Sequence, residues 1–567
     1  MSESTKSIPE DKEKANKDER SKRTSIFEEE GSSRAIVSGA YFFVFAVVGS
    51  ITLFIFNVMA TGNPGLEYYG ESFVLLNMFI AVGSGIYPSY VARVKATFVH
   101  DKERALIQAS SYSKLILVIG LIFSIAGFIV YLIVPSPFVK ASIIAIIPAV
   151  MLSYVTGSFS NMITLINRFD IAAFISSLFG IIVFLSGLIF ITFSFEPLWF
   201  SFIPLFTGVV SAILSLFFFT RVSPFKFKDI YTKGKLFSKE NSIFLKEGLY
   251  STLTNLEGLG VLGNTIIFIT TLSLFAFYPD LEQKGIHLIT IIMTYAIIKV
   301  AIIFFTGPLN VEISEATSKN NHEIVQDTMN NLGRICGIIG LTLTVFVCAL
   351  SPHILRYLHP DAFIDNGVHI EATLIMTTYL LILATIGEAC YGFSCLFGGA
   401  LIGSGNAKYS AVVFGTALIL IIPLTPLCVF FFGILGAGWA IFISGFYLLP
   451  LMFILVKKRL KVDFDLKVIN QAPYLIAIFL LVFLFPLGLI TGNALFDLVI
   501  VTALSIGILF FGIAFFGVMT PNDAKLIKDL TSSFNAKWVE NLVKKFGKFF
   551  YYLNPFHKKP KFEENET

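Results

Sequence analysis

Long apolar runs are the feature that most constrains this chain. A transmembrane helix needs about 20 mostly apolar residues, and fourteen segments between residues 36 and 518 come close to or exceed that length. They are 36–60, 71–91, 115–134, 143–165, 171–192, 198–219, 248–277, 286–307, 335–351, 372–397, 411–432, 437–455, 473–490 and 497–518. Barrel strands would instead alternate in polarity over about ten residues. The sequence therefore predicts an all-α polytopic membrane protein.

The composition excludes several other classes of protein. Only 14% of the 567 residues are charged and the mean hydropathy is +0.78, whereas soluble chains carry about 25% charged residues. A soluble enzyme, a disordered scaffold and a secreted disulfide protein are therefore excluded. The net charge of +4 gives no bulk signal for nucleic acid. The five cysteines lie in apolar runs without C-x-x-C spacing, so we expect neither disulfides nor a metal site.

Lysine and arginine in the loops predict the orientation. With the N-terminus inside, the inner loops hold 21 of these residues and the outer loops hold three. This bias follows the positive-inside rule. We therefore expect a cell-membrane protein with both termini in the cytoplasm and only short outer loops.

An internal repeat divides the chain. Shifting it by 220 residues places PSYVARVKATFVHDKE, from Pro88, on PLNVEISEATSKNNHE, from Pro308, with five identities in sixteen positions. A weaker match relates Asn167-Arg168-Phe169 to Asn406-Ala407-Lys408-Tyr409. Both halves start inside, so the repeats are parallel, as in some transporters.

We expect six segments of distinct character. These are a disordered tail (1–34), a first six-helix lobe (35–220), a linker (221–247), a second six-helix lobe (248–456), two added helices (457–518) and a basic amphipathic tail (519–567). The last of these has apolar residues every four positions among lysines. It suits a helix lying on an anionic inner leaflet or one packed on the protein's own loops.

Ionisable residues inside the spans are candidate functional groups, because burying charge in a bilayer is costly. Glu257, Lys299 and Glu388 fall at a similar predicted depth, in the inner half of the second lobe. They could form a static ion cluster, contact substrate or a coupling ion, or reach the lipid edge.

Two features lie at the ends of spans 2 and 8. Arg93 could be a positive-inside anchor or a cation that meets a phosphate at the mouth of a cavity. Pro88 and Pro308 could kink their helices at matching positions and serve as hinges, or simply mark where each span ends.

Catalytic and cofactor motifs are weak. Gly258-Leu-Gly260-Val-Leu-Gly263 fits G-x-G-x-x-G but lies inside an apolar span, which favours helix packing over nucleotide binding. We expect no cofactor. The outer loop holds His353, His359, Asp361, Asp365, His369 and Glu371 without a fixed ligand spacing. It therefore reads as a solvated loop.

Residues 396–461 resemble a known family. A turn of small and basic residues and a span are followed by Gly433-Ile434-Leu435-Gly436-Ala437-Gly438-Trp439-Ala440. This pattern is similar to the multidrug/oligosaccharidyl-lipid/polysaccharide (MOP) exporter superfamily, in its polysaccharide transporter and lipid-linked oligosaccharide flippase branch. The loop at 307–334 resembles the family as well.

The resemblance implies a fold and a substrate. It implies the MATE-like arrangement of two six-helix lobes, rocking between inward-open and outward-open states, with a polyprenyl-linked oligosaccharide as substrate. Family flippases often place cations in the cleft, and Lys299, Arg93 and Arg168 are the residues here that match. Glu257 and Glu388 would tune Lys299 or couple an ion.

Three functions remain open at this point. The first is a flippase, the second a cation-coupled multidrug or small-solute antiporter, and the third a membrane glycosyltransferase or ligase. The multidrug branch often carries a carboxylate within the spans of its first lobe, which this sequence lacks. We therefore favour a monomeric flippase, whose partners are the lipid-linked oligosaccharide and membrane lipids.

Overall fold

The computed structural model describes, with short gaps, residues 65–223, 228–254, 305–358 and 364–464, together with isolated positions elsewhere. Helices dominate these ranges. The first group comprises α3 (Gly65–His100), α4 (Lys102–Ile133), α5 (Pro137–Leu165), α6 (Phe169–Thr192), the 3-10 helix η1 (Pro197–Phe202) and α7 (Ile203–Val222). The second comprises α14 (His322–Leu358), α15 (Glu371–Gly403), α16 (Ala407–Phe432) and α17 (Leu435–Leu460). Two shorter helices are α9 (Lys239–Thr254) and α13 (Thr306–Ser318).

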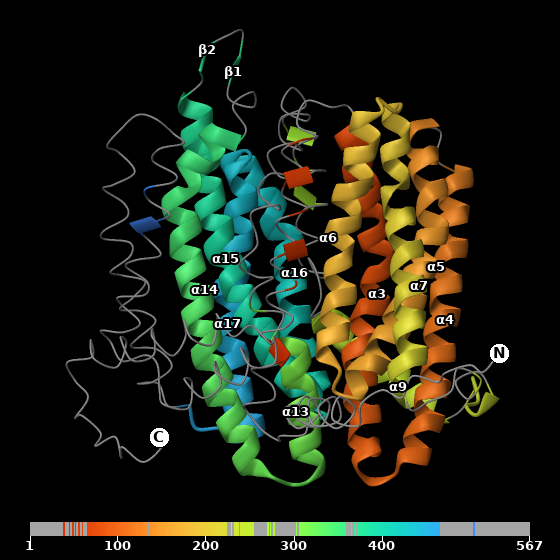
Figure 1. Ribbon diagram of the computed structural model, residues 1–567. Coiled ribbons are helices and arrows are strands. Elements are labelled where there is room, and N and C mark those ends of the chain that lie inside the picture. Colours follow the sequence, from red (N-terminus) through yellow and green to blue (C-terminus); the bar gives the residue numbers. More distant parts are fainter. Residues whose placement is uncertain are drawn as a thin grey trace, which may run out of the picture.

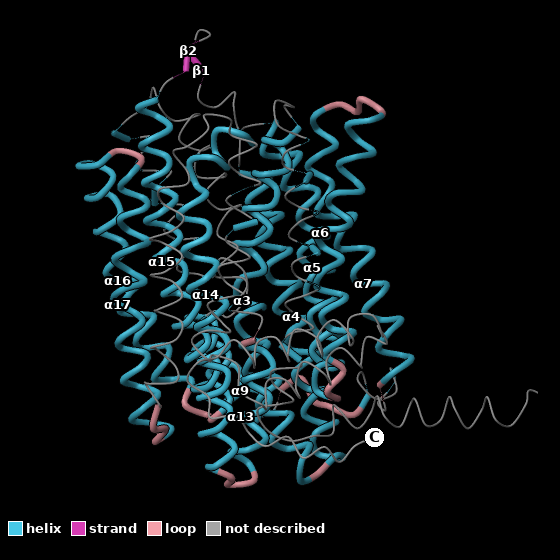
Figure 2. Tube along the Cα trace, turned by 60° about the vertical axis from the view of Figure 1, so that its left-hand side comes forward, coloured by secondary structure: helices cyan, strands magenta, loops and turns pink. Residues whose placement is uncertain are grey.

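These helices form two bundles that stand side by side (Figure 1). We call α3 to α7 the first bundle and α14 to α17 the second bundle. The short helices α9 and α13 lie together at one end of the molecule (Figure 2). Both contact α3, while α13 also packs on α14 and α15, and α9 on α16. One end of the molecule is therefore bridged by short helices that touch both bundles.

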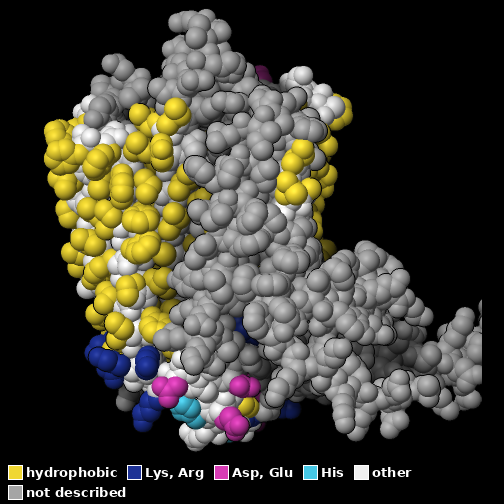
Figure 3. Space-filling model, turned by 90° about the vertical axis from the view of Figure 1, so that its left-hand side faces the viewer, with side chains coloured by type: hydrophobic (Ala, Val, Ile, Leu, Met, Phe, Trp, Pro, Cys, Tyr) yellow, Lys and Arg dark blue, Asp and Glu magenta, His cyan; other side chains and the backbone are white. Residues whose placement is uncertain are grey.

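Charge distinguishes the two ends. Along the described chain, the cations at the helix ends near α9 and α13 are Lys102, Arg104, Arg168, Arg221, Lys319, Lys408, Lys457, Lys458 and Arg459. We call this the basic end. Between the two ends, apolar side chains cover much of the described surface seen in Figure 3. Within the described residues, eight helices are long and apolar enough to cross a membrane.

The eight helices match eight of the fourteen predicted spans, so the helical membrane fold is confirmed at that level. The full count of fourteen, like the tails 1–34 and 519–567 and most of 457–518, lies outside the described residues. The loop between α14 and α15 contains a small antiparallel hairpin. Its two strands, of two residues each, are β1 (Ile364–Asp365) and β2 (Val368–His369).

Several helices are longer than the sequence predicts. The second span was expected to end at 91, yet α3 continues to His100. Similarly, α15 ends at Gly403 instead of 397, and α9 already begins at Lys239, inside the predicted linker 221–247. Hydropathy detects the apolar core of a membrane helix. The backbone can remain helical beyond it, where polar side chains reach the headgroups.

The helix bounds repeat along the chain. Helix α4 begins at Lys102 and α14 at His322, which are 220 positions apart, as the sequence repeat predicts. Helices α6 and α16 begin at Phe169 and Ala407, which are 238 apart. Of the 18 extra residues, nine lie in the loop between α14 and α15 that holds the hairpin, and nine lengthen α14 and α15 relative to α4 and α5. The turns before α6 and α16 also match, because Asn167 and Gly405, again 238 apart, both adopt left-handed conformations (φ 60° and 77°).

The resemblance motif forms a tight corner between α16 and α17. Gly433 ends α16 with a φ of 58°. A Cβ at Gly436 would lie 2.3 Å from the backbone of Cys428, so only glycine fits there. Ala440 is fully buried. The small residues of this motif therefore allow two long helices to meet closely at the end opposite the basic end.

Candidate functional site

The last four turns of α3 form a polar seam with α9 and α13 at the basic end. Two faces of the helix take part. Ser89 and Arg93, four residues apart, face α9, while Pro88, Ala92 and Lys95 face α13. Residues three and four apart lie on one face of a helix. One helix of the first bundle is therefore held from two sides by helices that also contact the second bundle.

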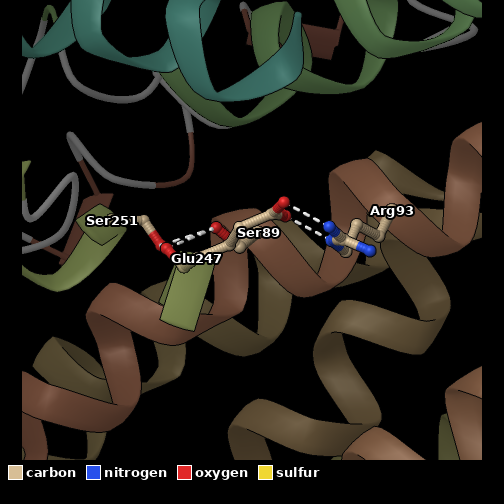
Figure 4. Close-up of polar contacts among 4 residues, drawn as sticks. All are labelled: Ser89, Arg93, Glu247 and Ser251. Carbon is tan, nitrogen blue, oxygen red and sulfur yellow. Dashed lines mark hydrogen bonds and ion pairs between the residues drawn. The ribbon is translucent and has the colours of Figure 1, made fainter. Parts of the chain in front are cut away.

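The α9 side of the seam is an arginine–glutamate pair. Both guanidinium nitrogens Nε and Nη2 of Arg93 donate to the carboxylate of Glu247 (Figure 4). Beside them, the hydroxyls of Ser89 and Ser251 lie 2.7 Å apart (Figure 4). The hydrogen bonds that Arg93 donates to Glu247 raise the pKa of its guanidinium above the ordinary value. About 30% of each side chain is exposed, so water weakens this pair.

The α13 side holds a more deeply buried pair. Lys95 Nζ lies 3.4 Å from Glu315 Oε2, and the two side chains are only 5% and 11% exposed. Lys95 also donates to Asn167 Oδ1 over 2.9 Å, in the turn between α5 and α6. Glu315 Oε1 in turn accepts from Lys319, one turn along α13, over 3.1 Å. These four residues form a charge network that crosses from the first bundle to α13.

Backbone carbonyls of α3 complete the contact with α13. Asn310 Nδ2 donates to the Pro88 carbonyl over 2.9 Å, and Ser314 Oγ donates to the Ala92 carbonyl over 2.6 Å. Further along, His100 Nε2 lies 3.3 Å from the Ser318 carbonyl. The seam thus continues over about three helical turns of α13.

Two of the three candidate cations from the sequence, Arg93 and Arg168, lie at the basic end but make different contacts. Arg93 pairs with Glu247, as described above. Arg168 pairs with Asp170, two residues away, through Nε (3.0 Å) and Nη2 (2.9 Å), and its side chain is 41% exposed. The structure does not bring Arg93 and Arg168 into one described cluster. Lys299 lies outside the described residues.

Glu388 is buried within α15, in the second bundle. It lies fifteen residues before Gly403, the end of α15, which places it about 22 Å from the basic end of the helix. The sequence had placed it about nine residues from that end of its span. Glu388 is therefore near the middle of its helix. Glu257 lies outside the described residues, so the proposed three-residue cluster stays a prediction.

The two prolines occupy unlike places. Pro88 lies inside α3, which continues for twelve residues beyond it, and its carbonyl accepts from Asn310. Pro308 lies in the first turn of α13, where proline is well tolerated. Their role as hinges stays a prediction. Within the described residues there is no group of three or more metal-ligating side chains.

Sequence reasoning missed the residues that build the seam, in particular Lys95, Glu247, Asn310 and Glu315. A signal was present for one pair. The shift of 220 residues places Lys95 on Glu315, and side chains of parallel repeats that lie close to their pseudo-two-fold axis face their own equivalents. Opposite charges at such positions predict an ion pair.

Comparison with known proteins gives a match at the level of fold. No protein-family model matches the chain, and the curated proteins give no match. Solved structures do match. One is the outward-facing conformation of a multidrug resistance MATE family transporter of the MOP superfamily, with a TM-score of 0.64 at 14% identity. The match covers 77% of this chain and 97% of that one.

Two further structures agree. A MOP superfamily transporter from Pyrococcus furiosus matches with a TM-score of 0.63 at 14% identity, over 77% of this chain and 97% of that one. Its binding pocket is described as having a reverse polarity that suggests a different function. A MATE structure in complex with MaL6 matches with a TM-score of 0.62 at 13% identity, over 77% and 98%.

These observations define a class of protein. The chain is a multi-pass membrane protein, because eight described helices are long and apolar enough to span a bilayer. Its fold is that of MATE transporters of the MOP superfamily. The fold expected from the resemblance is confirmed at this level, while the flippase branch stays a prediction.

Proposed function

We propose that this protein is an exporter of the MOP superfamily that moves its substrate by alternating access of the two bundles. The polar seam is the observation that carries this proposal. It joins the bundles at the basic end through hydrogen bonds and ion pairs, which can part and re-form in water at little net cost. An interface of this kind suits repeated opening.

We assign the basic end to the cytoplasm by the positive-inside rule. The state described is then closed toward the cytoplasm. This agrees with the fold match to a transporter described as outward-facing. Both termini would lie in the cytoplasm of a cell-membrane protein.

We further infer that the substrate is a polyprenyl-linked oligosaccharide. The sequence resemblance at 396–461 supports this assignment, and so does the absence of carboxylates from the interior of the first lobe's spans. The basic end would attract the diphosphate headgroup. Arg93, Arg168 and Lys299 are the cations we assign to this role, and Pro88 and Pro308 are the proposed hinges.

Reconstitution tests the proposed function directly. The purified chain is placed in liposomes that contain a fluorescent polyprenyl-diphosphate oligosaccharide, and a membrane-impermeant quencher reports the fraction exposed outside. We expect the protected fraction to disappear in proteoliposomes but not in empty liposomes. In the host, deletion should accumulate the lipid-linked oligosaccharide on the inner leaflet and remove surface glycan. Equal protection with and without protein would contradict a flippase.

Glu388 supports a second candidate, the cation-coupled antiporter. A buried carboxylate near the middle of α15 is a group that could bind a coupling ion. This function predicts that Glu388→Gln or Glu257→Gln abolishes export of small cations, and that deletion sensitises the host to toxic cations with surface glycan unchanged. A flippase uncoupled from cations keeps its activity in both variants.

The ligase or glycosyltransferase is tested in the outer loop. It predicts that His359→Ala or Asp361→Ala abolishes activity. A flippase should tolerate both changes. The solved structures reported above that share the fold are transport proteins. We therefore place this function last.

A further inference from the structure

We propose that Lys95 and Glu315 form a latch that holds the basic end closed and must part each time that end opens. The proposal rests on the alternating-access function above. It assigns a role in the cycle to a pair of residues from opposite sides of the seam. The two residues occupy equivalent positions of the internal repeat, 220 apart.

The two residues lie on opposite sides of the seam. Lys95 lies on α3 and Glu315 on α13, and the ions approach to 3.4 Å while their side chains are 5% and 11% exposed. Opening the basic end would separate α3 from α13. This ion pair cannot survive that separation, so its making and breaking is coupled to the state of the seam.

Each ion also has a second polar partner on its own side of the seam. Lys95 donates to Asn167 over 2.9 Å, within the first bundle. Glu315 accepts from Lys319 over 3.1 Å, within α13. When the bundles part, neither ion loses every partner that the closed state gives it.

The energetics of the ion pair allow it to form and break repeatedly. A buried ion pair contributes little net stability, because desolvation of the two ions offsets their attraction. Removing one partner is a different matter: without Glu315 the buried Lys95 lacks its counter-ion across the seam, and without Lys95 the buried Glu315 keeps Lys319, which does not cross the seam. An intact latch therefore closes the seam without making it permanent, whereas a half latch disfavours the closed state. An apolar contact of the same area would instead give the closed state a large net stabilisation, which opening would have to overcome.

The remaining seam contacts explain why the pair meets in register. Asn310 and Ser314 donate to carbonyls of α3 that lie about two turns and one turn, respectively, before Lys95. These bonds fix the helices along and around their axes. Lys95 and Glu315 then add an electrostatic attraction, which depends on their opposite charges.

Electron spin distances on the full-length protein in nanodiscs test the latch. Spin labels are attached at Glu103→Cys and Glu323→Cys, which are exposed and lie on either side of the seam. We expect a predominantly short distance in the otherwise unchanged chain. Lys95→Gln and Glu315→Gln should each shift the ratio of long to short distances about tenfold or more. A sample without the introduced cysteines controls for labelling of the five native ones.

Lys319→Gln is the matched control. It removes an ion pair with the same carboxylate that does not cross the seam. The distance ratio should change less than threefold, by our estimate for a pair that lies on one helix. The charge swap, Lys95→Glu with Glu315→Lys, should restore the short distance. It is made in the Lys319→Gln background, because a lysine at position 315 would otherwise face a second lysine. Equal distance distributions in Lys95→Gln, Lys319→Gln and the unchanged chain would overturn the latch.

A disulfide provides a second test that does not depend on losing the charge. Ser314 Oγ lies 2.6 Å from the Ala92 carbonyl, so Ala92→Cys and Ser314→Cys are neighbours across the seam, and a disulfide between them is made by oxidation and verified by mass spectrometry. We expect the oxidised protein to stop transport and the reduced protein to resume it. Undiminished transport in the fully oxidised protein would show that the seam need not open.

The outcomes separate the latch from the proposed substrate. If the distances respond as expected but no lipid-linked oligosaccharide moves, the substrate assignment fails and the latch stands. If the oligosaccharide moves and the distances do not respond to Lys95→Gln, the latch fails and the flippase stands.

Discussion

Gly403, the last residue of α15, is the position where one added methyl group should loosen the polar seam. A Cβ placed there would lie 2.6 Å from the Asn310 carbonyl oxygen, 3.0 Å from Asn310 Oδ1 and 3.2 Å from Ile313 Cβ. Ordinary contact begins at 3.4 Å, so Gly403→Ala requires a displacement of about 0.8 Å between α15 and α13. Asn310 is the residue whose amide holds the Pro88 carbonyl.

The expected cost follows from that displacement. Overpacking by one methyl group typically costs about 1–3 kcal/mol. If it is borne by the closed seam, the ratio of closed to open molecules falls about 5- to 150-fold. The spin-label pair at positions 103 and 323 measures this ratio. Gly307→Ala is the control, since a Cβ in α13 at that position meets nothing within 4 Å. Identical distance distributions for Gly403→Ala and Gly307→Ala would refute the reasoning.

Three further predictions concern stability, and thermal unfolding of the purified protein in one detergent checks each. Phe244→Ala should destabilise the protein by about 3–5 kcal/mol, because the ring is fully buried and stacks on Tyr112 with centroids 3.9 Å apart; an unchanged midpoint would contradict this. Arg168→Gln should cost about 1 kcal/mol or less, because its pair with Asp170 is partly exposed, and a larger loss would point to contacts beyond that pair. Gly415→Ala should stabilise α16 by about 0.5–1 kcal/mol, since glycine is a poor helix residue and an added Cβ meets nothing within 4 Å.

The membrane helices could be predicted because the bilayer imposes one simple rule. A span must be apolar for about 20 residues, and eight described helices satisfy it where the sequence places them. Their ends could not be predicted as well. Helix α3 carries Arg93 and Lys95 beyond its apolar part, and hydropathy cannot distinguish such a helical extension from a loop.

The seam was only partly accessible to sequence reasoning. Arg93 was a candidate cation, but its partner Glu247 had been assigned to a linker, because α9 begins before its apolar run does. Partners 154 residues apart leave no local pattern. Lys95 and Glu315 were already aligned by the repeat, yet charge alone suggested only loop anchors. Recognising the pair needed the additional argument that symmetry-related residues near an axis meet each other.

The opposite charges at these two equivalent positions have an evolutionary consequence. In a dimer of two identical chains, a residue on the two-fold axis faces its own copy. Lysine would face lysine and glutamate would face glutamate, and the like charges would repel. Only after duplication had made the two halves distinct could position 95 carry one sign and position 315 the other. The ion pair is therefore a contact that a symmetric ancestor could not have made.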